Sequence, residues 1–274
     1  MAYTFGALAS DDITFTFGLS LGATNRAQLI AGWWYPTTLT ATRGLWSAGN
    51  VMGAEIAATT SELVLRTDNT TDGQWTTTGA NLVVNQWRFL AFYLTATNTP
   101  AAQWRVWSGD LQTPPAACTI TVNTAPAGNF VGNTSFYVGN KGTSTTQAFQ
   151  GAVGNVAGAG LGNAAPPLGI FNSTNFGQLN AEQELWIYQN YVLQYWLGEA
   201  WPRAMQDTSY GGGGNVAAFF MDMDCTPSPR VWQFSSGTAA TFLAPAVSGA
   251  TKSLLRSPIG NGSLKTSKQI VVRR

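Results

Sequence analysis

The chain has 274 residues, 45% of them hydrophobic and only 10% charged, and this is enough apolar material to bury a sizeable core. It contains no histidine, which excludes Ser-His-Asp and Cys-His catalysis, His-ligated zinc and an imidazole pH switch. The net charge of +1 is unevenly distributed: residues 1–224 carry seven basic and thirteen acidic residues, a charge of −6, whereas residues 225–274 carry seven basic and no acidic residues, a charge of +7.

Short segments with a strand pattern fill the first two thirds of the chain. Residues 13–19 alternate Ile, Phe and Leu with Thr and Gly, which is the period of a half-buried strand. Similar segments follow at intervals of 8–15 residues, separated by turn-forming residues. This spacing predicts an antiparallel β-sandwich and argues against βαβ units. The expected strands cover residues 13–19, 28–35, 45–50, 54–59, 62–68, 74–79, 86–95, 103–107, 118–123, 135–140 and 148–162.

Residues 180–197 change to a helical period. Asn180 can cap the first turn with Gln183 as its capping-box partner, and apolar and aromatic residues then recur at helical spacing up to Gly198. The sequence therefore predicts one helix over 180–197. After a run of glycines at 211–214, the strand pattern resumes over residues 215–225 and 230–236.

The composition changes again at about residue 244. Residues 244–274 contain six basic and no acidic residues and too little apolar material for a core. The sequence thus predicts a sandwich over 1–243 and an extended basic arm over 244–274, ending in a β-like segment at 269–272. The candidate partner-binding residues in this arm are Lys252, Arg256, Lys265, Lys268, Ile270, Val271, Val272, Arg273 and Arg274.

Such an arm is expected to dock on an acidic partner, either nucleic acid or the body of a neighbouring copy. Nucleic-acid binding is the less favoured of the two, because the charge is sparse and no aromatic residue is interleaved for base stacking. A contact across a subunit boundary fits better, with the terminal segment adding a strand to another sheet. A solubilising tail without a fixed partner is the alternative.

Neither a membrane segment nor a secretory leader is expected. No run approaches the roughly 18 apolar residues of a membrane helix, and the first residues lack a basic segment followed by an apolar one. The two cysteines, Cys118 and Cys225, do not form a disulfide framework, and their pairing stays open.

Four segments in order resemble the concanavalin A-like jelly roll in its laminin-G-like form. They are AQLIAGWWYPTTLTATRGLWSAGN, NQWRFLAFYLTATNTPAAQWRVWSGD, SFYVGNKGTSTTQAFQGAVGNVAGAGLG and LNAEQELWIYQNY, which together cover roughly residues 13–200. The sequence departs from the family pattern in having Arg88 where a His usually follows the Trp, a longer helix and the C-terminal arm. The resemblance implies two packed antiparallel sheets, with most tryptophans in the core. The tryptophans expected there are Trp33, Trp46, Trp75, Trp87, Trp104 and Trp107.

Three kinds of site are candidates on this scaffold, each with a structural alternative. Asp222 and Asp224 lie two apart on a predicted strand, as glycosidase carboxylates can, but they also fit a solvent-facing side. Asp68 and Asp72 offer oxygen ligands for calcium, but they also fit a polar hairpin turn. Glycan binding is implied by the family alone, without identified residues.

The expectation is a non-enzymatic structural protein without cofactors. The composition, with few charges, no histidine and a polar arm, is typical of proteins in symmetric shells. The resemblance to jelly-roll domains found in tailed-phage particles suggests, more specifically, a capsid decoration or cement protein. A homotrimer on the capsid exterior is favoured. Its partners would be the major capsid protein and neighbouring copies, clamped by the arm and by helix 180–197. The alternatives are a glycan-binding receptor-recognition module of a tail fibre and a lectin-like surface domain.

Overall fold

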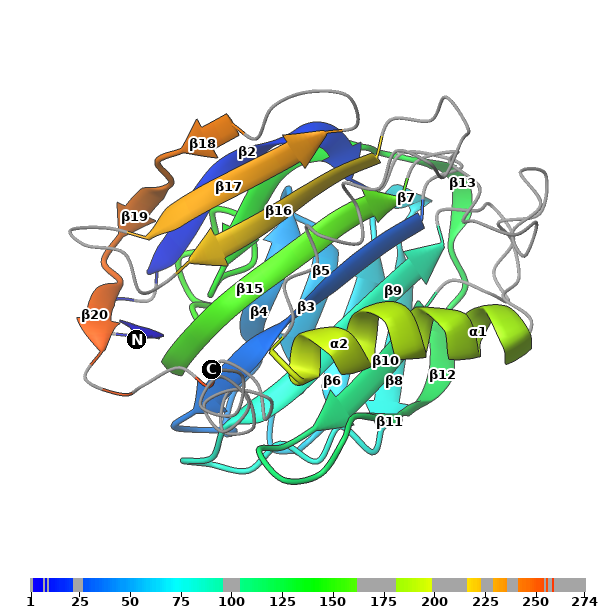
Figure 1. Cartoon of the computed structure of the whole chain (residues 1–274), viewed down its shortest axis with the longest axis horizontal. Helices are drawn as coiled ribbons and strands as arrows, with labels where there is room; N and C mark the ends of the chain where they lie inside the picture. The colour runs from blue at the N-terminus through cyan, green and yellow to red at the C-terminus, as the bar shows by residue number, and fades with distance from the viewer. Residues whose placement is uncertain are drawn as a thin grey trace, which may run out of the picture.

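A computed structural model describes residues 2–6, 8, 10–21, 27–95, 104–161, 181–198, 216–222, 229–235, 241–253, 255 and 258. Within these residues the strands form two large sheets that lie face to face, and a helical segment crosses the front of one of them (Figure 1). The pairs of named strands are antiparallel. The predicted antiparallel β-sandwich is therefore confirmed.

The first sheet contains ten of the described strands. Eight of them run in the order β11 (Ala116–Ala117), β10 (Trp104–Gly109), β9 (Arg88–Thr95), β3 (Ala27–Pro36), β15 (Gly151–Leu161), β16 (Val216–Asp222), β17 (Arg230–Ser235) and β18 (Thr241–Leu243). The remaining two are β1 (Ala2–Phe5), which pairs with β15, and β20 (Thr251–Ser253), which pairs with β1.

The second sheet contains eight described strands. They run in the order β12 (Thr119–Thr124), β8 (Gly73–Thr78), β6 (Leu63–Thr67), β5 (Met52–Ile56), β4 (Arg43–Ala48), β14 (Asn133–Val138), β2 (Asp12–Leu21) and β19 (Ala246–Ser248). A small two-stranded ribbon, β7 (Asn69–Thr71) with β13 (Ala127–Phe130), extends the β8–β12 pair.

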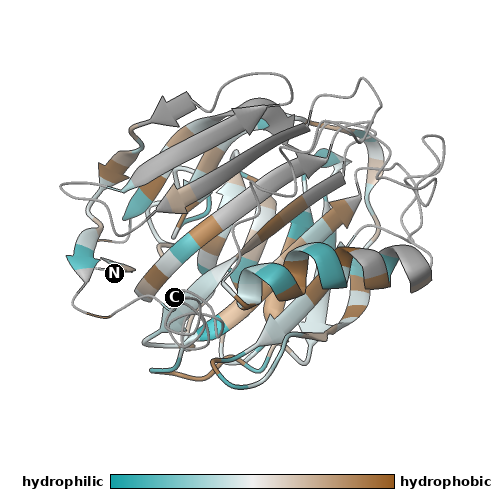
Figure 2. Cartoon of the chain, viewed as in Figure 1, coloured by the Kyte–Doolittle hydropathy of each residue, from teal (hydrophilic) through white to brown (hydrophobic). Residues whose placement is uncertain are grey.

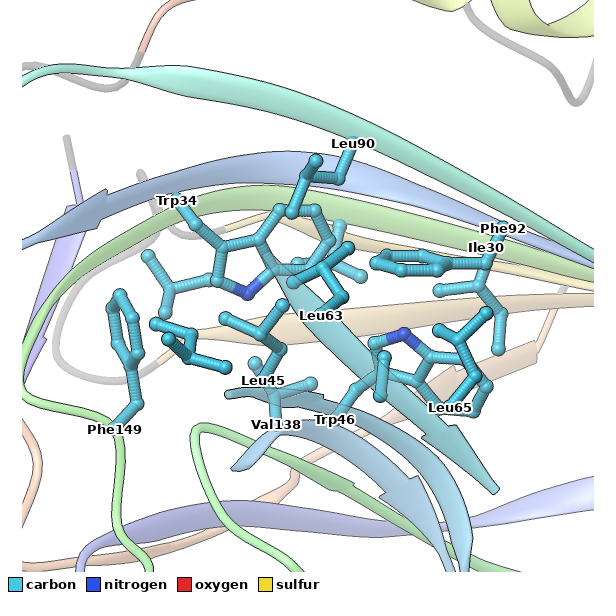
Figure 3. Close-up of a cluster of buried hydrophobic side chains, with 14 of the residues drawn as sticks. Ile30, Trp34, Leu45, Trp46, Leu63, Leu65, Leu90, Phe92, Val138 and Phe149 are labelled. Atoms are coloured by element: carbon cyan, nitrogen blue, oxygen red, sulfur yellow. The ribbon is translucent and has the colours of Figure 1, made fainter. Parts of the chain in front are cut away.

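Alternation along the strands divides the aromatic residues between two cores. In β3, Trp34 faces the second sheet, whereas its neighbour Trp33 faces the helix. Figure 3 shows Trp34 and Phe92 of the first sheet directed toward Trp46 of the second, and the Trp46 ring stacks on Phe136 at 5.7 Å. Of the six tryptophans expected in the core, five are buried and Trp87 is half-buried.

The predicted helix is present, with an irregularity that the sequence did not indicate. α1 (Ala181–Ile187) continues through a π-helical stretch (Tyr188–Val192) into α2 (Leu193–Trp196). One side of this segment lies on β3, β9 and β10, where Val192 and Tyr195 pack among Trp33, Phe89 and Trp107. Figure 2 shows hydrophilic residues on the turns of the helix that face away from the sheet.

The boundary of the predicted arm differs from the structure. β19 and β20 belong to the segment expected to extend from the body, yet β19 pairs with β2 and β20 pairs with β1. The turn between them, at Gly249, packs against the buried carboxylate of Asp11. Residues 246–253 are therefore attached to both sheets. The sequence pattern missed these strands because each has only three residues.

None of the helices in the described part of the chain has the length and apolar character to span a membrane.

Candidate functional site

The two acids considered for calcium lie at either end of β7, between β6 and β8. Asp72 accepts a hydrogen bond from the backbone N–H of Asn69 at 3.2 Å, and the carbonyl of Asp68 accepts one from Val131 at 2.8 Å. Burial, and then the neighbouring Asp72, raises the pKa of Asp68. No Lys or Arg of the described chain forms a salt bridge with either acid. This loop therefore concentrates negative charge beside the start of β8.

A metal site needs more ligands than this loop shows. Calcium takes six to eight oxygen atoms, and the described residues contain no group of three or more His, Cys, Asp or Glu placed to hold a metal ion. Two buried side-chain oxygens near these acids in the sequence, Oγ1 of Thr67 and Oδ1 of Asn69, have no hydrogen-bond partner. The geometry supports a polar turn more directly than an ion site.

The predicted carboxylate pair is placed only in part. Asp222 is the last residue of β16, and the preceding Met221 is fully buried in the core between the sheets. Asp224 lies outside the described residues, as does Cys225. Cys118 is a buried free thiol, and its pKa is raised to about 12 by burial and by the nearby Glu62.

The basic residues of the arm are also placed in part. Lys252 lies half-buried on β20, opposite Tyr3 of β1. The others predicted to bind a partner lie outside the described residues: Arg256, Lys265, Lys268, Ile270, Val271, Val272, Arg273 and Arg274. What the structure adds is the anchor that precedes them. Asp11 accepts hydrogen bonds from the N–H groups of Gly6 and Leu8, at 2.8 and 3.1 Å, and so ties the β1 end to the β19–β20 turn.

A charged cluster that sequence reasoning missed lies on the outer side of the second sheet. Glu55 of β5 is buried, and its Oε1 accepts from Arg66 Nε at 2.9 Å and from Lys141 Nζ at 2.8 Å. Arg66 also donates to Gln74 at 2.9 Å. These residues are far apart in sequence, so only the register β5–β6–β8 reveals the cluster. Because the two cations neutralise the buried carboxylate, removing one member would leave an uncompensated charge, so we interpret the cluster as structural.

Aromatic rings with partial exposure gather at one end of the first sheet. Tyr35 and Trp87 pack at 5.4 Å between ring centroids, and both are half-buried. The adjoining loop between β8 and β9 exposes Val83 and Val84, and its Asn85 N–H donates to the carbonyl of Pro36 at 2.7 Å. The resemblance to the jelly roll implied a core position for Trp87, but this residue lies in the loop just before β9 and keeps one side exposed.

The helix is fastened at both ends over the aromatic face of the first sheet. Arg105 of β10 pairs with Glu184 of α1 at 3.0 Å, and the Trp196 indole N–H donates to the carbonyl of Asp110 at 2.8 Å. Between these ties, the hydroxyl of Tyr93 is fully buried without a hydrogen-bond partner, and burial raises its pKa. The helix therefore covers the part of this sheet face formed by β3, β9 and β10.

Comparison with known proteins adds the following. No family model and no curated protein matches the chain. Among solved structures, it is similar to domains LG4-5 of the mouse laminin alpha1 chain, with 16% identity, a TM-score of 0.32 and coverage of 54% of this chain and 41% of that one. It is also similar to the NanB sialidase of Streptococcus pneumoniae, with 9% identity, a TM-score of 0.36 and coverage of 88% and 39%. A third is the leech intramolecular trans-sialidase, with 12% identity, a TM-score of 0.28 and coverage of 88% and 38%. The chain thus spans about two fifths of the length of each of these structures.

Proposed function

We propose that the protein is a non-catalytic structural protein of a virus particle, a decoration or cement protein that binds the shell of a tailed phage. Its partners in this proposal are the major capsid protein and neighbouring copies of itself, arranged as a trimer on the capsid exterior. The observation that carries the proposal is the attachment of residues 246–253 to both sheets, immediately before the basic tail. A basic segment that leaves the body from a fixed point suits a fastening role.

The distribution of charge supports the same role. The body has few charges, and several of them pair with one another, including Glu55 with Arg66 and Glu184 with Arg105. Few charges limit the like-charge repulsion between neighbouring bodies, and the charge of −6 on residues 1–224 is complementary to the charge of +7 on residues 225–274. The remaining acids of the body attract the acid-free tail of a neighbour, which steers the contact.

The copy number of the chain in purified particles tests this proposal. A decoration protein is present in hundreds of copies and rebinds stoichiometrically to shells from which it has been stripped. A handful of copies would indicate a tail component, and absence from particles would overturn the viral role. Sugar hydrolysis that is lost in Asp222→Asn would overturn the non-catalytic role.

A second candidate function is glycan binding, and the half-buried pair of Tyr35 and Trp87 favours it. Sugars stack on partly exposed aromatic rings, and the neighbouring Asn85 and Gln86 are exposed and can form hydrogen bonds. A glycan array with the wild-type chain and with Trp87→Ala tests this function. Tyr137→Ala, which removes a half-buried tyrosine from the other sheet, is the matched control. Glycan binding that is lost only in Trp87→Ala would support this function, and no binding by the wild-type chain would exclude it for the sugars tested.

A further inference from the structure

We propose that the edge of β12 accepts the segment Lys268–Arg273 of a neighbouring copy as an added strand. This inference rests on the proposed fastening role of the tail and deepens it by naming the surface that the tail occupies. It depends on four observations: an open strand edge, a matching length, acids near both ends of that edge, and the distance between the anchor of the tail and its own β12.

The edge of β12 is open in the described part of the chain. β12 is the terminal strand of the second sheet and pairs on one side with β8. Five of its six residues are exposed, including Val122 at 48%. It is longer than the terminal strands β11, β18 and β19, which have two or three residues. An exposed strand edge presents unpaired backbone donors and acceptors, which are a template for another strand.

The length of the regular part of β12 matches the terminal segment. Its pairing with β8 is regular over Thr119–Val122 and then shifts before Thr124. The β-like part of the tail, residues 269–272, also has four residues, three of them Ile or Val. Lys268 and Arg273 flank it and are five residues apart, about 17 Å in an extended strand, which is also the separation of Thr119 and Thr124.

Negative charge lies near both ends of β12. Near Thr124, β8 begins directly after Asp72, and neither Asp72 nor Asp68 has a salt-bridge partner among the described residues. Near Thr119, the carboxylate of Glu62 accepts from the N–H of Gly79, the residue after β8. The basic residues that flank the added strand would therefore meet an acid at each end. The attraction is expected to be stronger at the Asp72 end, because the charge of Arg88 already acts on Glu62.

Distance favours a neighbour over the chain's own tail. β19 and β12 are opposite edges of one sheet, seven interstrand spacings or about 34 Å apart. The last anchored strand, β20, ends at Ser253 on the far side of the molecule from β12 (Figure 1). Lys268 lies fifteen residue steps after Ser253, which span about 50 Å when fully straight. The straight separation of the two edges is already about two thirds of that length, and a path over the surface is longer, whereas Pro258, Gly260 and Gly262 favour turns within the segment.

Disulfide trapping between two differently marked copies tests the inference. Both copies carry Cys118→Ala and Cys225→Ser. The first copy carries Val122→Cys and ends at Pro258, and the second carries Val271→Cys on the full chain. Val83→Cys, which replaces a side chain of similar exposure in the loop between β8 and β9, outside the strand edge of β12, replaces Val122→Cys in the control. Docking raises the local thiol concentration, so we expect about tenfold more mixed disulfide with Val122→Cys than with Val83→Cys.

Two further variants keep the test independent of a folding defect. Asp72→Lys should reduce the mixed disulfide, and Arg273→Asp in the second copy should restore it. Equal trapping at Val83 and Val122, or trapping only within one chain that carries both cysteines, would overturn the inference. Shell binding is measured on the same proteins. Binding to shells without the mixed disulfide would contradict only the strand addition. Formation of the mixed disulfide without binding to shells would contradict only the proposed function.

Discussion

Two carboxylates of the sandwich are paired with cations but differ in burial, and this difference gives the first prediction. Glu55 is buried between Arg66 and Lys141, whereas Glu184 and its partner Arg105 are each about 30% exposed. Glu55→Gln should lower the free energy of unfolding by about 1–3 kcal/mol, because two partly buried cations lose their counter-charge. Glu184→Gln should cost less than about 1 kcal/mol. Urea unfolding of both variants measures the difference, and equal losses would show that the Glu55 cluster is no more than a surface ion pair.

Two aspartates should respond to neutralisation with opposite signs. Burial and Asp72 raise the pKa of Asp68, so at neutral pH the ionised carboxylate destabilises the fold; this penalty is absent below its ordinary pKa of 3.8. Asp68→Asn should therefore raise the Tm at pH 7, and the gain should vanish as the pH falls through the raised pKa of Asp68 toward 3.8. The chain ending at Pro258 is the protein to use, so that no tail neutralises this acid.

Neutralising Asp110 should have the opposite effect on stability from neutralising Asp68. Burial would raise its pKa, but the hydrogen bonds from Gln112 and Thr113 and the charge of Arg88 outweigh it, and the pKa is lowered. Its ionised form therefore stabilises the fold above the ordinary pKa of 3.8, and this contribution is lost as the pH falls through the lowered value. Asp110→Asn should lower the free energy of unfolding at pH 7 by up to about 1 kcal/mol. A change in Tm at pH 7 of the same sign in Asp68→Asn and Asp110→Asn would contradict this assignment of the two environments.

At the scale of elements, the helix is a cover whose attachment is separable from the sandwich. Val192 is fully buried against the first sheet, and Gln189 is exposed on the same π-helical stretch. Val192→Asp should lift the helix, because an unpaired charge cannot stay in an apolar contact. The exposed face would then bind a hydrophobic dye, and Trp33 and Trp107 would shift their fluorescence to longer wavelength. Gln189→Asp should change neither signal; retention of the wild-type spectrum in Val192→Asp would show that the helix tolerates the charge in place.

The elements also show how far the sequence determines the fold. Alternation identified the long strands, because Leu29 and Trp33 face one side of β3 while Ile30 and Trp34 face the other. Helix 180–197 was predictable from its period, but the π-helical stretch was not, because the spacing of apolar residues does not reveal a single turn with a wider hydrogen-bond pattern. Three-residue strands such as β19 have no measurable period. Their place is set by contacts such as Gly249 with Asp11, more than 200 residues away in the chain.

The candidate sites depend still more on long-range contacts. Asp68 and Asp72 are close in sequence and could be named from it, although only the structure shows that no described cation neutralises them. Glu55 pairs with Lys141, which lies in a loop far away in the sequence. Tyr35 near the end of β3 packs on Trp87, which precedes the neighbouring strand β9. Neither cluster therefore has a local sequence signature. Sites of this kind follow from the register of the sheets, which single-sequence patterns leave open.

For the whole molecule, the proposed function requires that a basic tail fastens the charge-poor sandwich to a larger assembly. The most direct test measures binding to empty shells, and the melting temperature of those shells, with the full chain and with the chain ending at Pro258. The shortened chain keeps β19 and β20, so the sandwich stays intact. The account predicts that the full chain binds to saturation and raises the shell melting temperature. Loss of four basic residues should weaken the shortened chain about tenfold or more. Equal binding and equal stabilisation by both chains would contradict the account.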